Sequence, residues 1–173
     1  VAGDVGPLGV RIAPYGRVKP EEARAAFAEQ IKALADAGVD LIVIETMSDL
    51  YEIQEAIKAA KSVVGAPLPV IASVTFTRDD RTLLGDDPVK VAHKIHETGA
   101  DVIGVNCSGG PSQLLRILKQ MKQAVPDGKF WVNNHAHVLR VTNGVNPRWV
   151  YYALIHRNLQ RFLKGATRPK LNQ

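Results

Sequence analysis

Residues 100–111 read ADVIGVNCSGGP, and this stretch decides the fold. Val102, Ile103 and Val105 form an apolar run that is too short for a helix and too continuous for a strand with one wet face. This pattern predicts a parallel strand that is covered on both sides. Cys107 follows at the carboxyl end of the strand, where sheets built from βα units bind their ligands. The stretch therefore places a thiol and a glycine-rich turn where a site is expected.

Similar patterns recur along the chain. Apolar runs typical of strands occupy residues 1–5, 40–46, 69–76, 101–106 and 130–132. Helical patterns alternate with them at residues 20–37, 49–64, 88–98, 112–124 and 151–163. From residue 40 onward the strands recur about every 30 residues, which is typical of one βα unit. The chain thus predicts about five such units, either as an open doubly wound sheet or as a contiguous part of a (β/α)8 barrel.

Several residue types mark the predicted helix ends. Pro20 and Gly38 suit the first turn and the end of one helix, and Asp87 with Gly99 suit those of another. Asp49, with Glu52 three residues later, predicts a capping box, in which each side chain bonds the other residue's backbone N–H.

The composition of the 173 residues, 46% hydrophobic and 23% charged, predicts one packed domain. A single cysteine excludes an internal disulfide and favours a reducing compartment, so the cytoplasm is expected. No apolar run approaches the roughly 20 residues that cross a bilayer, and no membrane partner is expected. Residues 140–173 hold seven Arg or Lys and no Asp or Glu. Since no nucleic-acid motif accompanies this basic segment, a solvated helix face is the interpretation, with no nucleic-acid partner.

Polar side chains gather at the predicted strand ends. Glu45 and Thr46 end one strand, Thr75 the next, and Asn106 and Cys107 the next. Because parallel strands bring these ends to one edge, the side chains are expected to lie in one common site, as catalytic residues do in α/β barrels. Glu45 either caps the following helix or accepts hydrogen bonds from a cationic group such as a substrate amine.

Cys107 and the Ser108-Gly109-Gly110 turn admit several uses. The thiol is a small buried hydrophobe, a nucleophile near a helix amino terminus, or a ligand for a metal such as zinc. The turn, alternatively, cradles a phosphate or another small anion with its backbone N–H groups. Spacing alone does not rank these readings.

Four stretches together resemble the homocysteine S-methyltransferase domain found in methionine synthases and in bifunctional enzymes fused to methylenetetrahydrofolate reductase. They are VAGDVGP (residues 1–7), VIETMSDL (43–50), VIASVTF (70–76) and GVNCSGGP (104–111). The resemblance runs through about residues 1–132 and leaves 133–173 as a divergent basic tail. It implies an α/β fold of parallel βα units, an incomplete (β/α)8 TIM barrel covering about strands 3 to 7. Residues 1–173 are accordingly expected to form one partial homocysteine-binding barrel domain.

The resemblance also implies a site. Cys107 matches one of the three cysteines that hold the family's Zn²⁺, and Glu45 matches the glutamate that binds the amino group of homocysteine. Thr46 and Asn106 are expected to bind substrate beside them. The implied reaction is methyl transfer to the homocysteine thiol, which Zn²⁺ activates by deprotonation, giving methionine. The methyl donor is expected to derive from folate or a corrinoid, and a fused or associated methylenetetrahydrofolate reductase domain is a further expected partner.

This sequence departs from the family pattern in two places. The final Gly-Gly-Cys-Cys motif, with the other two zinc cysteines, has no counterpart, so the chain is expected to be a truncated and catalytically incomplete enzyme. In WVNNHAH (residues 131–137), His135 and His137 stand where the family has Pro-Asn-Ala-Gly, and they are alternative metal ligands. The competing hypothesis is a non-catalytic five-stranded α/β module that binds a small anion at Ser108-Gly109-Gly110.

Overall fold

The computed structural model describes residues 1–63, 68–133, 163–164 and 170–171. The chain divides into two units, Val1–Asn134 and His135–Gln173. In the second unit the short strands β6 (Leu163–Lys164) and β7 (Lys170–Leu171) pair antiparallel. The helix expected at 151–163 falls outside the described residues except for Leu163, which belongs to β6. The single domain over 1–173 stays a prediction.

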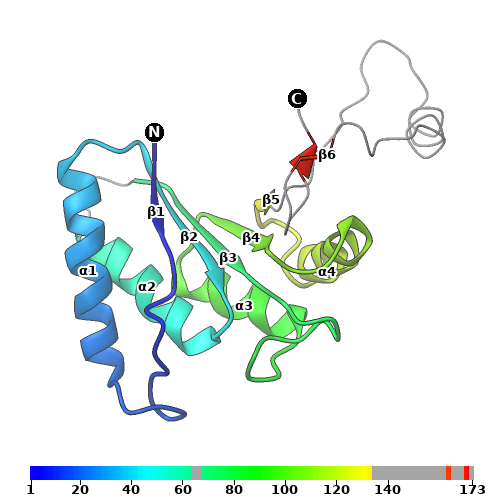
Figure 1. Cartoon of the computed structure of the whole chain (residues 1–173), viewed down its shortest axis with the longest axis horizontal. Coiled ribbons are helices and arrows are strands. Elements are labelled where there is room, and N and C mark those ends of the chain that lie inside the picture. The colour runs from blue at the N-terminus through cyan, green and yellow to red at the C-terminus, as the bar shows by residue number, and fades with distance from the viewer. Residues whose placement is uncertain (64–67, 134–162, 165–169, 172–173) are drawn as a thin grey trace. The chain divides into compact units, whose positions relative to one another are not determined.

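The first unit is a sheet of five parallel strands with four helices (Figure 1). The strands are β1 (Ala2–Val5), β2 (Leu41–Met47), β3 (Val70–Val74), β4 (Val102–Asn106) and β5 (Phe130–Asn133). The helices are α1 (Pro20–Asp36), α2 (Leu50–Val63), α3 (Pro88–Thr98) and α4 (Pro111–Ala124). One helix connects each pair of consecutive strands, so the five predicted strands and the period of one βα unit are confirmed.

The strand order separates the two architectures that periodicity left open. The order is β1-β2-β3-β4-β5, without the reversal that defines a doubly wound sheet. Right-handed crossovers in a sequential parallel sheet place all helices on one face. Accordingly each helix packs against its sequence neighbours, α1 on α2, α2 on α3 and α3 on α4. The fold is an incomplete (β/α)8 barrel.

Burial alternates along β1 and most of β2, where one face of the sheet carries helices, while β3 and β4 in the middle of the sheet are buried at nearly every position. On β2, Ile42 and Ile44 are fully buried against the helices, while Leu41 and Val43 on the other face are half-buried. Phe27 from α1 and Ile57 from α2 fill the core between helices and sheet. The second face corresponds to the inside of a closed barrel.

The helix ends follow the sequence signals with one exception. Asp87 Oδ1 accepts a 2.9 Å hydrogen bond from Lys90 N–H, and Gly99 ends α3 in the left-handed conformation. Asp49 Oδ1 likewise accepts the N–H groups of Tyr51 and Glu52 at the start of α2. The capping box predicted a bond from the Asp49 backbone N–H to the Glu52 side chain. Instead, the Glu52 carboxylate accepts the N–H of Leu8 at 2.7 Å and so connects the β1–α1 loop to α2.

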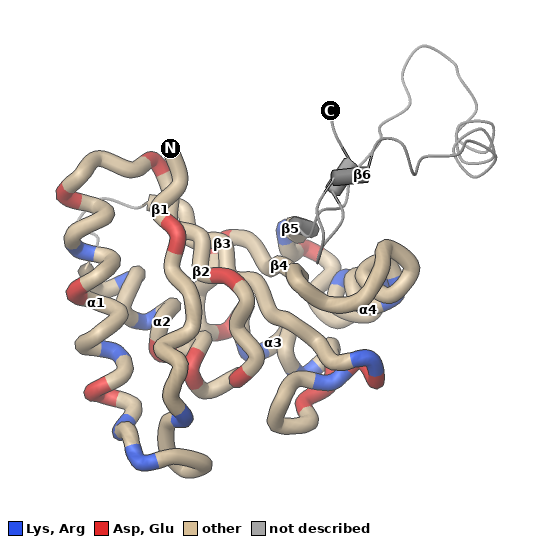
Figure 2. The backbone as a smooth tube through the Cα atoms, in the orientation of Figure 1, with Lys and Arg blue, Asp and Glu red and all other residues tan. Residues whose placement is uncertain are grey.

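The surface of the first unit is mixed in charge. Basic and acidic residues are interspersed over the helices and loops rather than gathered by sign (Figure 2). His93 and His96 on α3 are exposed. None of the described helices is long and apolar enough to cross a membrane.

Candidate functional site

A reciprocal pair of hydrogen bonds joins the ends of β2 and β4. The N–H of Thr46 donates to Asn106 Oδ1 at 2.9 Å, and Asn106 Nδ2 donates to Thr46 Oγ1 at 2.7 Å. Asn106 is 1% exposed, so the pair satisfies a buried amide. It also fixes the orientation of that amide, because the Thr46 N–H identifies the oxygen side.

Backbone geometry brings these two residues together although β3 lies between their strands. The pairing of β2 with β3 shifts register between Ile44 and Met47, and Thr46 within this irregularity has a φ of 63°. That left-handed conformation is uncommon for a β-branched residue, and such outliers cluster at functional sites. Here it turns the end of β2 toward Asn106.

Cys107 lies beside this pair. Its Sγ is 3.6 Å from Asn106 Nδ2 and 3.9 Å from Thr46 Oγ1, and both groups donate toward the sulfur. The residue is half-buried. Its φ is 48°, so it is the second residue at these strand ends, after Thr46, with a left-handed backbone. The sulfur therefore lies among polar groups, and this environment disfavours the reading of Cys107 as a small hydrophobe in the core.

Glu45 precedes Thr46 on β2 and is half-buried. The structure thus places Glu45, Thr46, Asn106 and Cys107 at the carboxyl ends of β2 and β4, and Thr46, Asn106 and Cys107 are in direct contact. The alternative ligands His135 and His137 lie outside the described residues.

The turn after Cys107 is bonded to the loop after β3 and to α4. Ser108 Oγ accepts the N–H of Phe76 at 2.9 Å, and Gln113 Oε1 accepts the N–H of Gly109 at 2.8 Å. Since the Gly109 N–H is already used within the protein, the turn offers fewer donors to an anion than the sequence suggested. This contact argues against the anion-binding module.

Sequence reasoning missed Gln113, although a signal was present. It is the third residue of α4, the position from which a glutamine side chain bonds back to the backbone before the helix. A capping-box search that begins at Ser or Thr overlooks it because Gly110 occupies the N-cap.

The described residues do not make up a zinc site. No group of three or more His, Cys, Asp or Glu side chains in the described part of the chain could hold a metal ion. Catalytic zinc sites take three protein ligands, and Cys107 offers one thiolate. Thr46 and Asn106 present neutral oxygen and nitrogen groups, which do not replace the missing ligands.

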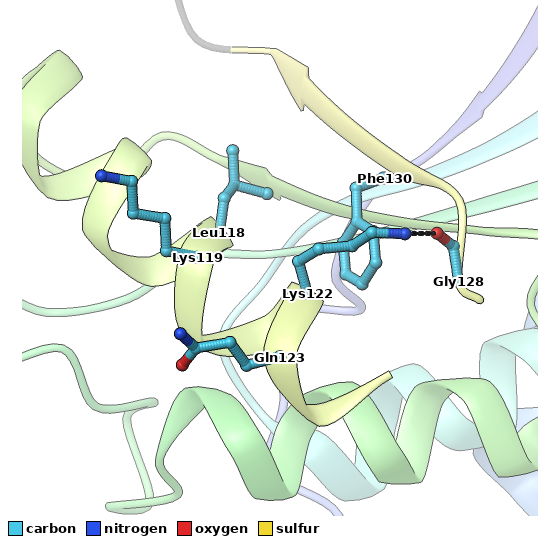
Figure 3. A pocket seen from close by; sticks show the side chains of 6 residues that line it. All are labelled: Leu118, Lys119, Lys122, Gln123, Gly128 and Phe130. Carbon is cyan, nitrogen blue, oxygen red and sulfur yellow. Dashed lines mark hydrogen bonds between the residues drawn. The ribbon is translucent and has the colours of Figure 1, made fainter. Parts of the chain in front are cut away.

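A groove of about 520 Å³ lies elsewhere, between α4 and β5. Leu118 and Phe130 line it, and Lys122 Nζ lies 5.3 Å from the Phe130 ring while donating to Gly128 O at 2.9 Å (Figure 3). Neighbouring helices of a barrel pack against each other on both sides. The apolar flank of α4 therefore has a structural explanation and carries no site residue.

A second cavity, of about 240 Å³, lies among the loops after β1, β2 and β3. Arg11, Asp49 and Glu52 line it together with Leu83. Burial raises the pKa of the Glu52 carboxyl and the negative charge of Asp49 adds to the rise, while the hydrogen bond from Leu8 opposes it. Folding thus favours the protonated form of Glu52.

This shift predicts a pH-dependent effect of Glu52→Gln. The folded state binds more protons than the unfolded state between the ordinary pKa of 4.5 and the raised value, so Glu52 makes the wild-type protein less stable as pH rises through that window. The substituted amide keeps an oxygen for Leu8 N–H and has no charge. The free energy of unfolding of the variant minus that of the wild type is expected to grow from pH 4 to pH 7, measured by urea unfolding.

Glu97→Gln is the matched control. Lys94 lowers the pKa of this exposed carboxyl on α3 through a hydrogen bond, so the difference between variant and wild type should change in the opposite direction with pH. A Glu52→Gln difference that stays constant or shrinks toward pH 7 would contradict the burial argument.

The parallel barrel segment places polar side chains at the carboxyl ends of its strands, which is the edge where α/β-barrel enzymes carry their active sites. Comparison with known proteins gives the family: the model described as homocysteine S-methyltransferase matches residues 1–159, and the chain belongs to this family. The family resemblance and the barrel expected from the sequence are confirmed.

The chain is similar to parts of longer proteins. It is 29% identical to the methionine synthase of Mycobacterium tuberculosis over 126 residues, 71% of this chain and 10% of that protein. It is 32% identical to the S-methylmethionine–homocysteine S-methyltransferase BHMT2 of Mus musculus over 104 residues, 60% of this chain and 28% of that protein. The metallated homocysteine methyltransferase MmuM of Escherichia coli shares the fold at a TM-score of 0.60 and 24% identity, covering 78% of this chain and 48% of that one.

Proposed function

We propose that this chain forms the part of a homocysteine S-methyltransferase barrel that binds homocysteine. In this proposal the Glu45 carboxylate accepts hydrogen bonds from the substrate ammonium group. Thr46 and Asn106 hold the strand ends in register and present polar atoms to the amino acid. Cys107 supplies one thiolate ligand for Zn²⁺.

The contact of Thr46, Asn106 and Cys107 carries this proposal. Three side chains from two non-adjacent strands meet at 2.7 to 3.9 Å, at the edge where α/β barrels bind substrates. Two of them occupy left-handed backbone, and packing alone gives no reason to retain that strain. Family membership and the methionine synthase relative support homocysteine as the substrate.

Methyl transfer, in the proposed reaction, forms a carbon–sulfur bond to homocysteine, releases the thiol proton and leaves the donor without its methyl group. A folate- or corrinoid-derived donor agrees with the methionine synthase relatives. The described residues supply one of the ligands that Zn²⁺ needs. We therefore propose that this chain alone binds zinc weakly and does not complete the reaction, that it acts in the cytoplasm, and that a methylenetetrahydrofolate reductase domain is a fused or associated partner.

Glu45→Gln is expected to weaken homocysteine binding by about tenfold to a hundredfold. The substitution keeps the size of the side chain and removes its charge, so a charge-assisted hydrogen bond worth about 1.5 to 3 kcal/mol is lost. Calorimetric titration of the chain with L-homocysteine, with and without Zn²⁺, measures the change.

Glu29→Gln is the control, because Glu29 is exposed on α1 and has no place in the proposed site. Equal affinities of the Glu45→Gln variant and the wild type would exclude the assigned role. Stoichiometric, tight zinc binding with methionine formation by this chain would show that the site is complete and would overturn the proposal of incompleteness.

A further inference from the structure

Gln113 connects three segments around the turn that carries Cys107. Its Oε1 accepts the Gly109 N–H at 2.8 Å, and its Nε2 donates to Thr77 O at 2.7 Å and to Asp80 Oδ1 at 2.8 Å. The residue is 9% exposed, so these bonds satisfy a buried amide. One side chain on α4 thus holds both the turn after β4 and the loop after β3.

Gly109 leaves room for this side chain. A Cβ at position 109 would lie 2.0 Å from Gln113 Oε1, closer than any real contact. With its three hydrogen bonds formed, the amide of Gln113 occupies the space that a side chain at 109 would need.

The other end of the connection is also fixed. Asp80 receives two charge-assisted hydrogen bonds from Arg116, from Nε at 2.6 Å and from Nη2 at 2.8 Å, in addition to the one from Gln113. Arg116 lies one helical turn after Gln113 on α4, so both residues bind the same carboxylate from one helix. The hydrogen bond from Arg116 keeps the pKa of Asp80 below its ordinary value, so the anchor stays charged at neutral pH.

We propose that Gln113 is a positioning residue that holds the Cys107 turn in the conformation in which its sulfur meets Thr46 and Asn106. Cys107 has a left-handed backbone and is two residues from the Gly109 N–H that Gln113 binds. Left-handed conformations of side-chain-bearing residues persist where surrounding contacts hold them. The inference rests on the proposed function only in assigning the turn to substrate binding.

Gln113→Leu tests the proposal because it keeps the volume and removes all three hydrogen bonds. Cys107 is the single cysteine, so alkylation by iodoacetamide reports on this turn alone. With the turn released, the sulfur opens to solvent more often, and the alkylation rate is expected to rise roughly tenfold. The Gly109 amide resonance should move in the same variant, and its hydrogen exchange should become faster.

Gln113→Glu is a second, milder variant, because it keeps one of the three hydrogen bonds that Gln113→Leu removes. The substituted carboxylate loses the bonds to Asp80 and the Thr77 carbonyl, and its charge repels both groups. It keeps an acceptor for the Gly109 N–H, and because this bond remains the alkylation rate should rise less than in Gln113→Leu. Gln123→Leu, an exposed position on the same helix, is the control and should alkylate at the wild-type rate. If the Gln113 variants fold and match the control in alkylation and in the Gly109 resonance, the positioning role is wrong.

Homocysteine titration distinguishes this inference from the proposed function. Weakened homocysteine binding in both Gln113→Leu and Glu45→Gln supports the proposed function and the positioning role of Gln113. Binding lost only in Glu45→Gln keeps the function and overturns positioning for substrate. A wild-type chain that binds no homocysteine, while Gln113→Leu still accelerates alkylation, overturns the function and keeps the structural role of Gln113 at the turn.

Discussion

Phe27→Ala is expected to lower the free energy of unfolding of this chain by about 3 to 5 kcal/mol. Phe27 is fully buried on α1, in the layer where α1 packs against β1 and α2. Removing the ring takes away apolar area and leaves a cavity, because close-packed surroundings relax only in part. Urea unfolding followed by circular dichroism measures the loss.

Glu29→Ala, an exposed position on the same helix, should change the free energy of unfolding by less than about 0.5 kcal/mol. The comparison also tests whether these five βα units unfold as one cooperative unit. A shallow transition that Phe27→Ala does not move would show that the residues around Phe27 are not part of a common packed core.

Gly104→Val is expected to cost about 3 kcal/mol, at the upper end of the usual overpacking penalty. Gly104 on β4 faces Ser73 on β3 in the register of the sheet. A Cβ at 104 would lie 2.0 Å from Ser73 Oγ and 3.0 Å from Ser73 Cβ. The hydroxyl can rotate away but the Cβ cannot, so the strands must separate just before Asn106 and Cys107. Thermal and urea unfolding measure the cost.

Pairing the smaller change Gly104→Ala with Ser73→Gly tests the cause. The double variant should recover most of the stability that Gly104→Ala alone loses, since the atoms in conflict are gone. Additive losses in the two single variants and the double variant would mean that the clash at Ser73 is not the reason for the glycine.

The strands and helix ends that depend on local sequence patterns were predictable from the sequence. The apolar runs became β2 to β4 because buried parallel strands need side chains that fit helices on the sheet, and Asp87 and Gly99 mark α3 because caps are local interactions. The choice between barrel and doubly wound sheet was not readable from periodicity. It depends on which strands are neighbours, and both folds use the same βα unit.

Contacts between distant segments account for what the sequence did not show. The side chain of Glu52 has two competing donors for its carboxylate, and the distant Leu8 N–H holds it rather than the local backbone of a capping box. The left-handed backbone at Thr46 and Cys107 was not foreseen either, since neither residue type favours it and the contacts around it come from distant segments: Asn106 bonds Thr46 from β4, and Gln113 bonds the turn after Cys107 from α4. Glu45, Thr46, Asn106 and Cys107 were named from strand ends, but their mutual geometry required the fold.

The left-handed backbone at Thr46 and Cys107 lowers the stability of the folded protein at the two residues that the proposed site uses. Glycine adopts that backbone conformation without the steric cost that a Thr or Cys side chain carries. Laboratory selection for heat resistance alone should therefore favour glycine at 107, while at 46 the hydroxyl that bonds the buried Asn106 amide opposes the exchange. Selection that demands substrate capture should keep cysteine at 107 and gain stability at other positions.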